Sequence, residues 1–498
     1  MNLARILEAS ASLFPDRPAV IWGGRTYTYA WLDRRADAAA AALVSLGLRP
    51  GDLAALCRPA SADWVALYYG ILKAGAAAVT LFSGLTAPEL RRHLADGRPV
   101  VLFLADGRSG DLGDRKALPF LKTVVAEDGD LPPGRFWDQG TAAGRALERD
   151  RDDTAAVLYT GGTTGTAKGV MLSHANILAS AHHVAWAERS TPADRALCFL
   201  PLNHVFGQMH ILQSTVLTGG AMVLLPGFDL EAVLAAIREH QVTKFYAVPT
   251  IYIRLLAQEG LREKLGPVRY TFSAAASMAR EVVAEWRERT GLDIHEAYGL
   301  TESASMVTFN HYHRHVVGSV GTPVGTVEVT IRDGEGRVLE AGREGEICIR
   351  GPNIMRGYLG RDQETREAFF GDWFRSGDVG RLDEDHYLFL VDRIKDMIIT
   401  GGENVYPREV EELLYERPEV QECSVVGLPD PEYGERVVAV ILPRPGHKVD
   451  GAALKEFLKP RLAAFKRPKD FIVVDDLPKS PAGKTLKREL KKKLAEKD

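Results

Sequence analysis

A run of threonine, glycine and lysine, YTGGTTGTAKGV at 159–170, has the residue types that can hold a phosphate group. It follows an apolar stretch, and glycine permits backbone conformations in which successive N–H groups turn toward phosphate oxygens. It is not a Walker A motif, because that pattern needs glycine directly before the lysine and Ala167 precedes Lys168 here. The alternative is an ordinary connection between a strand and a helix. We favour a phosphate-binding loop.

The elements that must position this loop alternate along the chain. Apolar, β-branched runs at 155–160, 221–226, 244–249 and 269–274 predict strands, and stretches such as EAVLAAIREH and REVVAEWRERT predict helices. This alternation predicts an α/β body of parallel-rich sheets covered by helices. A helix is also expected to begin near Ser173 or His174, after the loop.

The pattern changes in the last third of the sequence. From about Gly318, short strands joined by a DGEG turn predict a small β-rich subdomain that closes the body. The segment GGENVYPREVEELLYERPEV then reads as a turn followed by a helix, and CSVVGLPD as a strand. We therefore predict two domains, an N-terminal body at 1–394 and a smaller C-terminal α+β domain at 395–498.

Composition limits the class of protein. The chain has 498 residues, 46% of them hydrophobic and 26% charged, which is typical of a globular protein. A net charge of -4 gives no reason to expect nucleic acid as a partner. The four cysteines have no CxxC spacing, which argues against a zinc site or a disulfide framework.

The N-terminus lacks the apolar core of a signal peptide. The most apolar stretch, 65–82, is interrupted by Lys73 and reads as a buried helix running into a strand. We expect a cytoplasmic protein without a membrane span.

Five further motifs accompany the Thr/Gly loop. They are YGLTE at 298–302, GEICIRGPNIMRGYLG at 345–360, SGDVG at 376–380, VDRIKDMIITGGENVYPREVE at 391–411 and LPKSPAGKTLKREL at 477–490. In this order and spacing they resemble the adenylate-forming superfamily, which includes acyl-CoA synthetases, adenylation domains of peptide synthetases and beetle luciferases. The resemblance covers essentially the whole chain and is nearest to fatty acyl-CoA ligases.

The resemblance implies a site for ATP and Mg²⁺ in the body. The residues implied to bind the phosphates are Thr160, Gly161, Gly162, Thr163, Thr164, Gly165 and Lys168. Those implied to bind the adenine and AMP are Ala275, Ala276, Glu296, Ala297, Tyr298, Gly299 and Thr301. The matching glutamate, Glu302, is implied to hold the metal and to act with Thr301 in catalysis; a carboxylate suits an oxygen-preferring cation.

Three more residues acquire roles in the same way. Asp378 is implied to accept the ribose hydroxyls, with Arg393 beside it. Lys484 is implied to be the catalytic lysine, a point charge that offsets the negative charge where carboxylate and α-phosphate approach. A lone lysine near a chain end is otherwise solvent-facing.

The second half of the reaction is implied to need a mobile C-terminal domain. In similar enzymes this domain rotates about a residue that corresponds to Lys395, and a GG turn then lines a tunnel for coenzyme A. Gly401 and Gly402 match that turn, since a side chain would narrow such a passage. A plain turn is the alternative for both glycines.

The acid-binding pocket is expected in LPLNHVFGQMHI at 201–212. His204, Val205, Phe206 and Met209 are its candidates, together with Ala274 from the segment SAAASM. There is no Asp or Glu between residues 200 and 218 to pair with a substrate ammonium, which argues against an α-amino acid as the substrate. The apolar surroundings favour a medium- to long-chain fatty acid, with an aryl acid as the alternative.

The sequence thus predicts an ATP-dependent ligase that forms an acyl-adenylate and passes the acyl group to coenzyme A. Two other functions remain open: loading of a separate carrier protein, and a catalytically silent protein that binds nucleotide or acyl groups. The expected partners are the acid, ATP and coenzyme A, with a homodimer as a further option. A metal site at the alternating histidines of NHYHRHVVG is disfavoured, because no acid or cysteine completes it.

Overall fold

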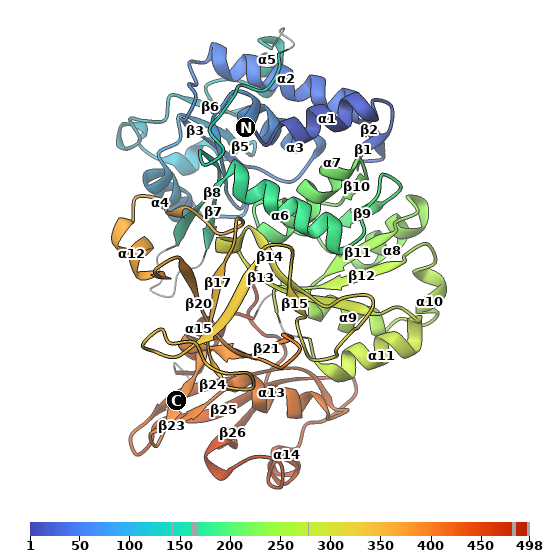
Figure 1. Ribbon diagram of the computed structural model, residues 1–498, viewed down its shortest axis with the longest axis vertical. Coiled ribbons are helices and arrows are strands. Elements are labelled where there is room, and N and C mark those ends of the chain that lie inside the picture. The colour runs from blue at the N-terminus through green and yellow to red at the C-terminus, as the bar shows by residue number, and fades with distance from the viewer. Residues whose placement is uncertain (141–143, 161–166, 277, 481–484, 496–498) are drawn as a thin grey trace.

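The computed structural model (Figure 1) describes residues 1–140, 144–160, 167–276, 278–480 and 485–495. Within these ranges the strands form four sheets. Two sheets and the helices around them make the large body, a third sheet lies beside them, and the fourth belongs to the C-terminal part at the lower end of the view in Figure 1.

The first sheet runs in the order β15-β14-β13-β12-β11-β9-β10-β1-β2. Its strands are β1 (Pro18–Trp22), β2 (Arg25–Thr28), β9 (Arg195–Cys198), β10 (Ala221–Leu224), β11 (Lys244–Ala247), β12 (Tyr270–Ser273), β13 (Ile294–Leu300), β14 (Ser305–Phe309) and β15 (Thr322–Pro323). The pairs from β1 through β10, β9, β11 and β12 to β13 are parallel. Helices α8 (Leu230–Glu239) and α11 (Arg280–Thr290) connect consecutive strands, so the predicted strand–helix alternation is confirmed.

The second sheet carries the Thr/Gly loop. Its order is β18-β8-β7-β4-β3-β5-β6. The strands are β3 (Leu53–Cys57), β4 (Ala77–Thr80), β5 (Val101–Leu104), β6 (Thr123–Val125), β7 (Thr154–Thr160), β8 (Lys168–Ser173) and β18 (Gly357–Tyr358). Because β7 and β8 pair antiparallel, the loop joins two neighbouring strands and not a strand and a helix.

Helix α6 (His174–Ala187) begins directly after β8. Its N-cap is Ser173, whose Oγ accepts a hydrogen bond from the Asn176 backbone N–H at 3.1 Å. A cap of this kind satisfies one of the free N–H groups at a helix start. The expected helix start near Ser173 is confirmed.

Two helices lie between the first and second sheets. Helix α3 (Ala62–Lys73) contacts β1 on one side and β3 and β4 on the other, and α6 contacts both β8 and β14. The position of α3 explains why even Lys73 is buried: its ammonium lies 2.6 Å from Asp33 and 2.5 Å from Asp37 of α2 (Tyr29–Ser45). The apolar stretch 65–82 therefore belongs to the core, as predicted.

The third sheet forms the predicted β-rich subdomain. It contains β16 (Glu328–Arg332), β17 (Gly345–Arg350), β19 (Phe369–Phe370), β20 (Trp373–Leu382) and β21 (Leu388–Arg393). The pairs β16–β17, β17–β20 and β20–β21 are antiparallel.

The C-terminal sheet has its own hydrophobic clusters, formed by residues from Ile398 onward. Its strands are β22 (Ile398–Thr400), β23 (Glu403–Val405), β24 (Val420–Asp430), β25 (Gly434–Pro443) and β26 (Asp470–Val473), and its helices are α13 (Pro407–Tyr415), α14 (Gly451–Leu458) and α15 (Lys487–Ala495). The division at residue 395 stays a prediction.

Other helices occur along the described part of the chain. They are α1 (Arg5–Leu13), α4 (Ala87–Gly97), α5 (Pro133–Asp138), α7 (Ser214–Thr218), α9 (Pro249–Leu256), α10 (Leu261–Lys264), α12 (Asp362–Glu367), η1 (Ser109–Leu112), η2 (Arg115–Ala117), the π-helix η3 (Phe206–Gln213), η4 (Thr301–Ser303), η5 (Ile394–Asp396) and η6 (Ala464–Lys466).

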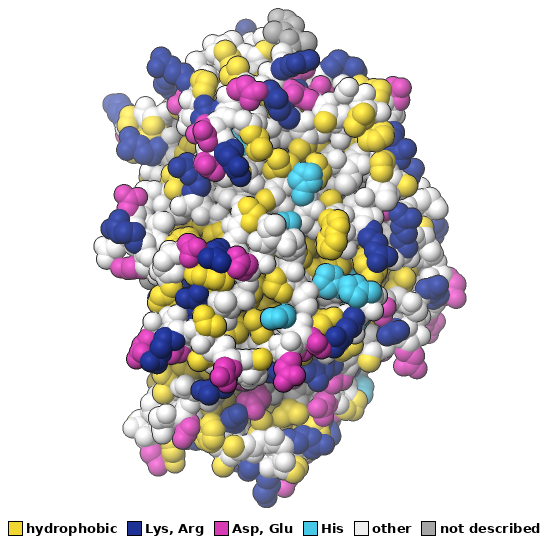
Figure 2. Space-filling model, in the orientation of Figure 1, with side chains coloured by type: hydrophobic (Ala, Val, Ile, Leu, Met, Phe, Trp, Pro, Cys, Tyr) yellow, Lys and Arg dark blue, Asp and Glu magenta, His cyan; other side chains and the backbone are white. Residues whose placement is uncertain are grey.

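The face of the molecule in Figure 2 mixes basic and acidic side chains, and histidines gather near its middle. In the described part of the chain, no helix has the length and apolar character that a membrane crossing needs.

Candidate active site

The YGLTE motif begins on β13 and ends in the short helix η4. The strand pair β13–β14 has an irregular register between Tyr298 and Gly299. A Cβ on Gly299 would lie 1.6 Å from the Ser305 carbonyl oxygen, so no other residue fits there without moving β14. The close approach of the β14 backbone is therefore by itself a reason for glycine at position 299, apart from the implied role in adenine binding.

Tyr298 and the two predicted ribose-binding residues come together. Asp378 on β20 and Arg393 at the end of β21 are direct cross-strand partners, with 3.0 Å between Arg393 Nε and Asp378 Oδ1. The Tyr298 hydroxyl donates to Asp378 Oδ2 at 2.7 Å. Burial and the Asp378 carboxylate raise the pKa of Tyr298, so the hydroxyl keeps its proton and remains a donor. These contacts orient both oxygens of the Asp378 carboxylate.

Glu302 has a partner that the sequence did not reveal. The Tyr358 hydroxyl donates to Glu302 Oε1 at 3.0 Å, and burial raises the pKa of Glu302. Tyr358 lies on β18, which pairs antiparallel with β8 and so lies beside the stem of the Thr/Gly loop. The motif at 345–360 contained this tyrosine, but only the strand pairing shows what it contacts.

The stem of the Thr/Gly loop is placed next to Glu302. Thr160 and Lys168 face each other across β7 and β8. The Lys168 ammonium lies 4.9 Å from the centre of the Tyr358 ring and 2.5 Å from Glu364 Oε2. Thr301 lies in η4, directly before Glu302. The predicted residues that lie outside the described ranges are Gly161, Gly162, Thr163, Thr164, Gly165 and Lys484.

A cavity of about 50 Å³ opens beside Tyr298. Predicted residues that line it are His204, Val205, Phe206, Ala274, Ala275, Ala297, Tyr298 and Gly299. Met209, Ala276 and Glu296 do not line it; Met209 is fully buried in the core, Glu296 is buried and Ala276 is exposed. Lining residues that sequence reasoning missed are His210, Phe272, Ser305 and Met306.

One acidic residue, Glu188, lies near this pocket, although it is outside the segment 200–218. Glu188 follows α6 in the chain, and its Oε1 lies 2.6 Å from His210 Nε2. Its other oxygen lies 3.1 Å from the Lys244 ammonium. Both oxygens of the Glu188 carboxylate thus already have partners. Glu188 is therefore not a ready partner for a substrate ammonium, and we still do not expect an α-amino acid.

The residues predicted for hinge and tunnel lie at the start of the C-terminal part. Lys395 lies in η5 with an exposed side chain, and partial desolvation and the Arg393 charge lower its pKa. Gly401 and Gly402 form the turn between β22 and β23, with φ of 60° and 83°. Positive φ favours glycine whether or not a tunnel passes there. The tunnel therefore stays a proposal.

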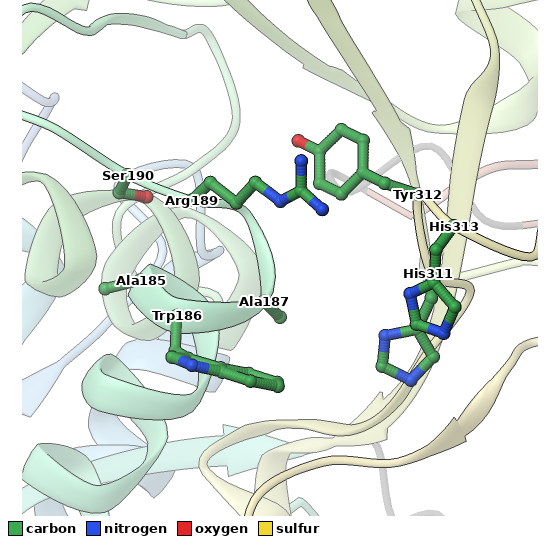
Figure 3. Close-up of a pocket in the computed structure, with 8 residues that line it drawn as sticks. All are labelled: Ala185, Trp186, Ala187, Arg189, Ser190, His311, Tyr312 and His313. Atoms are coloured by element: carbon green, nitrogen blue, oxygen red, sulfur yellow. The ribbon is translucent and has the colours of Figure 1, made fainter.

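A larger cavity of about 530 Å³ lies apart from these residues, between the end of α6 and the segment after β14 (Figure 3). Figure 3 shows the Arg189 side chain directed at the Tyr312 ring, 4.7 Å from its centre. His311 and His313 stack on each other at 5.0 Å, outside any strand. No group of three potential metal ligands occurs among the residues that the structure describes.

The comparisons with known proteins agree with this geometry. The family model described as AMP-binding enzyme matches residues 7–359, and the model of the AMP-binding enzyme C-terminal domain matches 409–484. The chain belongs to the AMP-binding enzyme family. Its predicted membership of the adenylate-forming superfamily is confirmed.

This AMP-binding enzyme is similar along its whole length to named CoA ligases. It is 35% identical to the feruloyl-CoA synthase of Amycolatopsis sp., with 97% of each chain covered. It is 34% identical to the long-chain-fatty-acid–CoA ligase of Bacillus subtilis (strain 168), with 98% of this chain and 94% of the relative covered. The structure of the anthranilate CoA ligase AuaEII with anthranoyl-AMP matches with a TM-score of 0.94 at 29% identity, covering 100% of this chain and 98% of the other. The predicted class, an ATP-dependent acyl-CoA ligase, is confirmed, whereas its acid is not fixed by these similarities.

Proposed function

We propose that this AMP-binding enzyme activates a compact aryl acid as acyl-AMP and transfers the acyl group to coenzyme A. We choose an aryl acid because of the cavity beside Tyr298. Its volume of about 50 Å³ is well below the roughly 150 Å³ of an apolar cavity that accepts benzene. A single ring therefore already needs side chains to move outward, and a long alkyl chain needs a larger movement.

The walls of the cavity support the same choice. The rings of Phe206 and Phe272 lie 5.6 Å apart at 66°, and the His210 ring lies 4.5 Å from Phe272. Such edge and offset contacts are those that a further aromatic ring can extend. Two of the similar proteins are named for aryl acids, whereas the Bacillus relative is named for long-chain fatty acids. A medium- to long-chain fatty acid, favoured by the sequence alone, is the second candidate.

In the first step the acid's carboxylate attacks the α-phosphorus of ATP, and pyrophosphate leaves. No protein nucleophile is needed, so catalysis consists of positioning and charge stabilisation. Asp378, held by Tyr298 and Arg393, is proposed to accept the ribose hydroxyls, and the loop whose stem is Thr160 and Lys168 is proposed to hold the phosphates. Lys484 is proposed to neutralise the charge between carboxylate and phosphate.

Glu302 is the residue that would hold Mg²⁺. Its carboxylate is a hard oxygen donor, and the Tyr358 hydroxyl, which donates to one of its two oxygens, orients it. When bound, the metal supplies positive charge against the phosphates. Glu302 lies beside the loop stem, which is where such charge is needed.

In the second step the thiol of coenzyme A attacks the acyl carbonyl, and AMP leaves. We propose that the C-terminal domain turns about Lys395 and that Gly401 and Gly402 then line the pantetheine path. A carrier protein is the alternative acceptor, and a homodimer is the proposed assembly, which light scattering can test.

A panel of acids tests this proposal. Benzoate, cinnamate and straight-chain acids from butanoate to hexadecanoate are each given with ATP, Mg²⁺ and coenzyme A, and both pyrophosphate and the CoA thioester are measured. We expect aryl acids to exceed dodecanoate in kcat/KM by about 10-fold or more, the loss typical of a poorly fitting pocket. A preference for dodecanoate or longer acids would transfer the assignment to fatty acids, and pyrophosphate release without loss of free thiol would indicate a carrier protein.

A further inference from the structure

Part of the lining of the cavity beside Tyr298 is polar. His210, in the π-helix η3, and Ser305, at the start of β14, both line it. His210 Nδ1 lies 3.1 Å from Ser305 Oγ. His210 is 2% exposed and Ser305 8% exposed, so the pair is buried against the cavity and not on the surface. An apolar acid would leave these groups facing a hydrocarbon.

A buried carboxylate fixes the orientation of the His210 ring. Glu188 is fully buried, and its Oε1 lies 2.6 Å from His210 Nε2. Burial by itself raises the pKa of Glu188, but the charge of Lys244, that of His210 when the ring is protonated, and hydrogen bonds from His210 and Tyr246 hold it at about 2. Glu188 is therefore ionised and accepts, which places a proton on His210 Nε2.

The neighbouring charges balance without a charge on His210. Lys244 lies 3.1 Å from Glu188 and 3.7 Å from Asp194, and Arg269 lies 2.5 Å from Asp194. Two carboxylates thus face two cations. In the neutral imidazole with its proton on Nε2, Nδ1 is an acceptor, so the Ser305 hydroxyl donates to it.

Because the Ser305 hydroxyl donates its proton in the hydrogen bond to His210, its Oγ is left as an acceptor for a group in the cavity. The backbone holds it there in an uncommon conformation, with φ of 111° at Ser305 and 49° at Ala304. The surrounding structure fixes this turn, since Ser180 donates to the Ala304 carbonyl at 2.6 Å and the Asn353 amide donates to the Ser303 and Met306 carbonyls. Backbone strain of this kind is retained where the surroundings over-determine it, often at ligand sites.

We propose that Ser305 and His210 recognise a hydrogen-bond-donating substituent, a phenolic hydroxyl or an aryl amine, on the acid. Ser305 Oγ accepts a hydrogen bond from the substituent. His210 is a positioning residue: it accepts the hydrogen bond of the Ser305 hydroxyl and is itself held by Glu188. This inference rests on the proposed aryl acid. It goes beyond that proposal by stating which aryl acids the enzyme prefers.

Matched acids give the sharpest test. Each monohydroxy isomer of benzoate and of cinnamate is compared with the corresponding methyl isomer, which has nearly the same shape and no donor. The wild type should prefer at least one hydroxy isomer over its methyl counterpart by about 10- to 100-fold in kcat/KM, since an acid that lacks the donor leaves a buried acceptor unpaired.

Three variants locate the preference. Ser305→Ala removes the acceptor and should reduce the hydroxy-to-methyl ratio to within about 3-fold. His210→Gln keeps an amide N–H that can reach Glu188 but has no acceptor at the position of Nδ1, where Ser305 donates, and it should reduce the ratio in the same way. Met306→Leu, at another lining position without polar atoms, is the control and should change both acids alike. Thermal melting checks that each variant folds.

The outcomes separate this inference from the proposed function. Aryl thioester formation with equal rates for hydroxy and methyl acids, or an unchanged ratio in Ser305→Ala, would overturn the recognition site and leave the aryl acid ligase standing. Activity with alkyl acids alone would overturn both. A ratio that falls in Ser305→Ala and His210→Gln but persists in Met306→Leu supports the proposal.

Discussion

Tyr358 illustrates how much of this site depends on side chains that the motifs contain but do not explain. It lies in a 16-residue motif, GEICIRGPNIMRGYLG, and the motif alone gives it no role. Its contact with Glu302 exists because β18 pairs with β8. His210 and Glu188 are a similar case, since they are separated in the sequence and meet only through the packing of α6 against η3. The sequence predicted Asp378 and Arg393 correctly as neighbours because both lie in recognisable motifs on adjacent strands.

Tyr358→Phe should weaken the binding of Mg²⁺ without changing the shape of the site. The hydroxyl orients the proposed ligand of the metal, and loss of such a supporting hydrogen bond typically costs roughly 10- to 100-fold in metal affinity. The Mg²⁺ concentration that gives half-maximal pyrophosphate release should rise accordingly. Tyr387→Phe removes a hydroxyl that donates to the Arg314 carbonyl and serves as the control. An unaltered Mg²⁺ dependence in Tyr358→Phe would argue against Glu302 as the ligand.

Lys484→Ala should separate the two half-reactions. Loss of one preorganised charge typically costs on the order of 10²–10³ in rate, so pyrophosphate release should nearly stop. If the C-terminal domain turns after adenylation, residue 484 has left the site when coenzyme A enters. The variant supplied with prepared acyl-AMP should then form acyl-CoA near the wild-type rate. Equal losses in both assays would contradict the two-conformation mechanism.

At the scale of elements, the sequence predicted apolar strands well and glycine-rich connections poorly. Strands β7, β10, β11 and β12 were predicted because β-branched runs alternate with amphipathic helices. The antiparallel pairing of β7 with β8 was not, since a Gly-rich loop fits a hairpin as well as a strand–helix connection. The turn at Gly401 and Gly402 shows the same ambiguity, because its positive φ values explain both glycines.

Gly402→Leu should impair thioester formation far more than adenylation. A side chain in a pantetheine path misplaces the thiol, which lowers the rate of thioester formation on the order of 100-fold. Pyrophosphate release uses other residues and should change little. Gly446→Leu is a matched control: Gly446 also has φ near 80°, and a Cβ there, as at Gly402, would meet no atom within 4 Å. The two variants share backbone strain. If Gly446→Leu lost as much thioester formation, strain and not a blocked passage would be the cause.

At the scale of the whole molecule, the C-terminal part contacts the body through α13. The Arg408 guanidinium donates to the Leu390 carbonyl of β21 at 2.7 Å, and the Arg408 backbone N–H donates to Asp392 at 2.9 Å. Arg408 and Glu412 also act electrostatically on Glu296 of β13. Glu296 is buried, and its Oε2 has no hydrogen-bond partner among the described residues. The pKa of Glu296 in the body thus depends on charges of helix α13 in the C-terminal part.

The stability of the protein should therefore fall with rising pH in a window set by Glu296. Burial, with Arg408 opposing and Glu412 adding to it, raises the pKa of Glu296 from 4.5 to about 8. Between these values the folded protein holds a proton that the unfolded chain has released, so stability declines as pH rises from about 5 to 8. Glu296→Gln should flatten the dependence of the melting temperature on pH in this range. Glu288→Gln, an exposed glutamate on α11, should leave the slope unchanged. An identical slope in Glu296→Gln would assign the effect to other groups.

Strand β18 also sets an order of events during protein synthesis. The chain leaves the ribosome N-terminus first, so β7 and β8 emerge long before residues 357–358, which pair with β8. Until then β8 has no strand paired along the edge that β18 later covers, and Glu302 lacks the hydrogen bond from the Tyr358 hydroxyl. A growing chain consequently completes the surroundings of its nucleotide site only when nearly the whole body has been translated, and a product that ends before β18 has the Thr/Gly loop without the strand that flanks it.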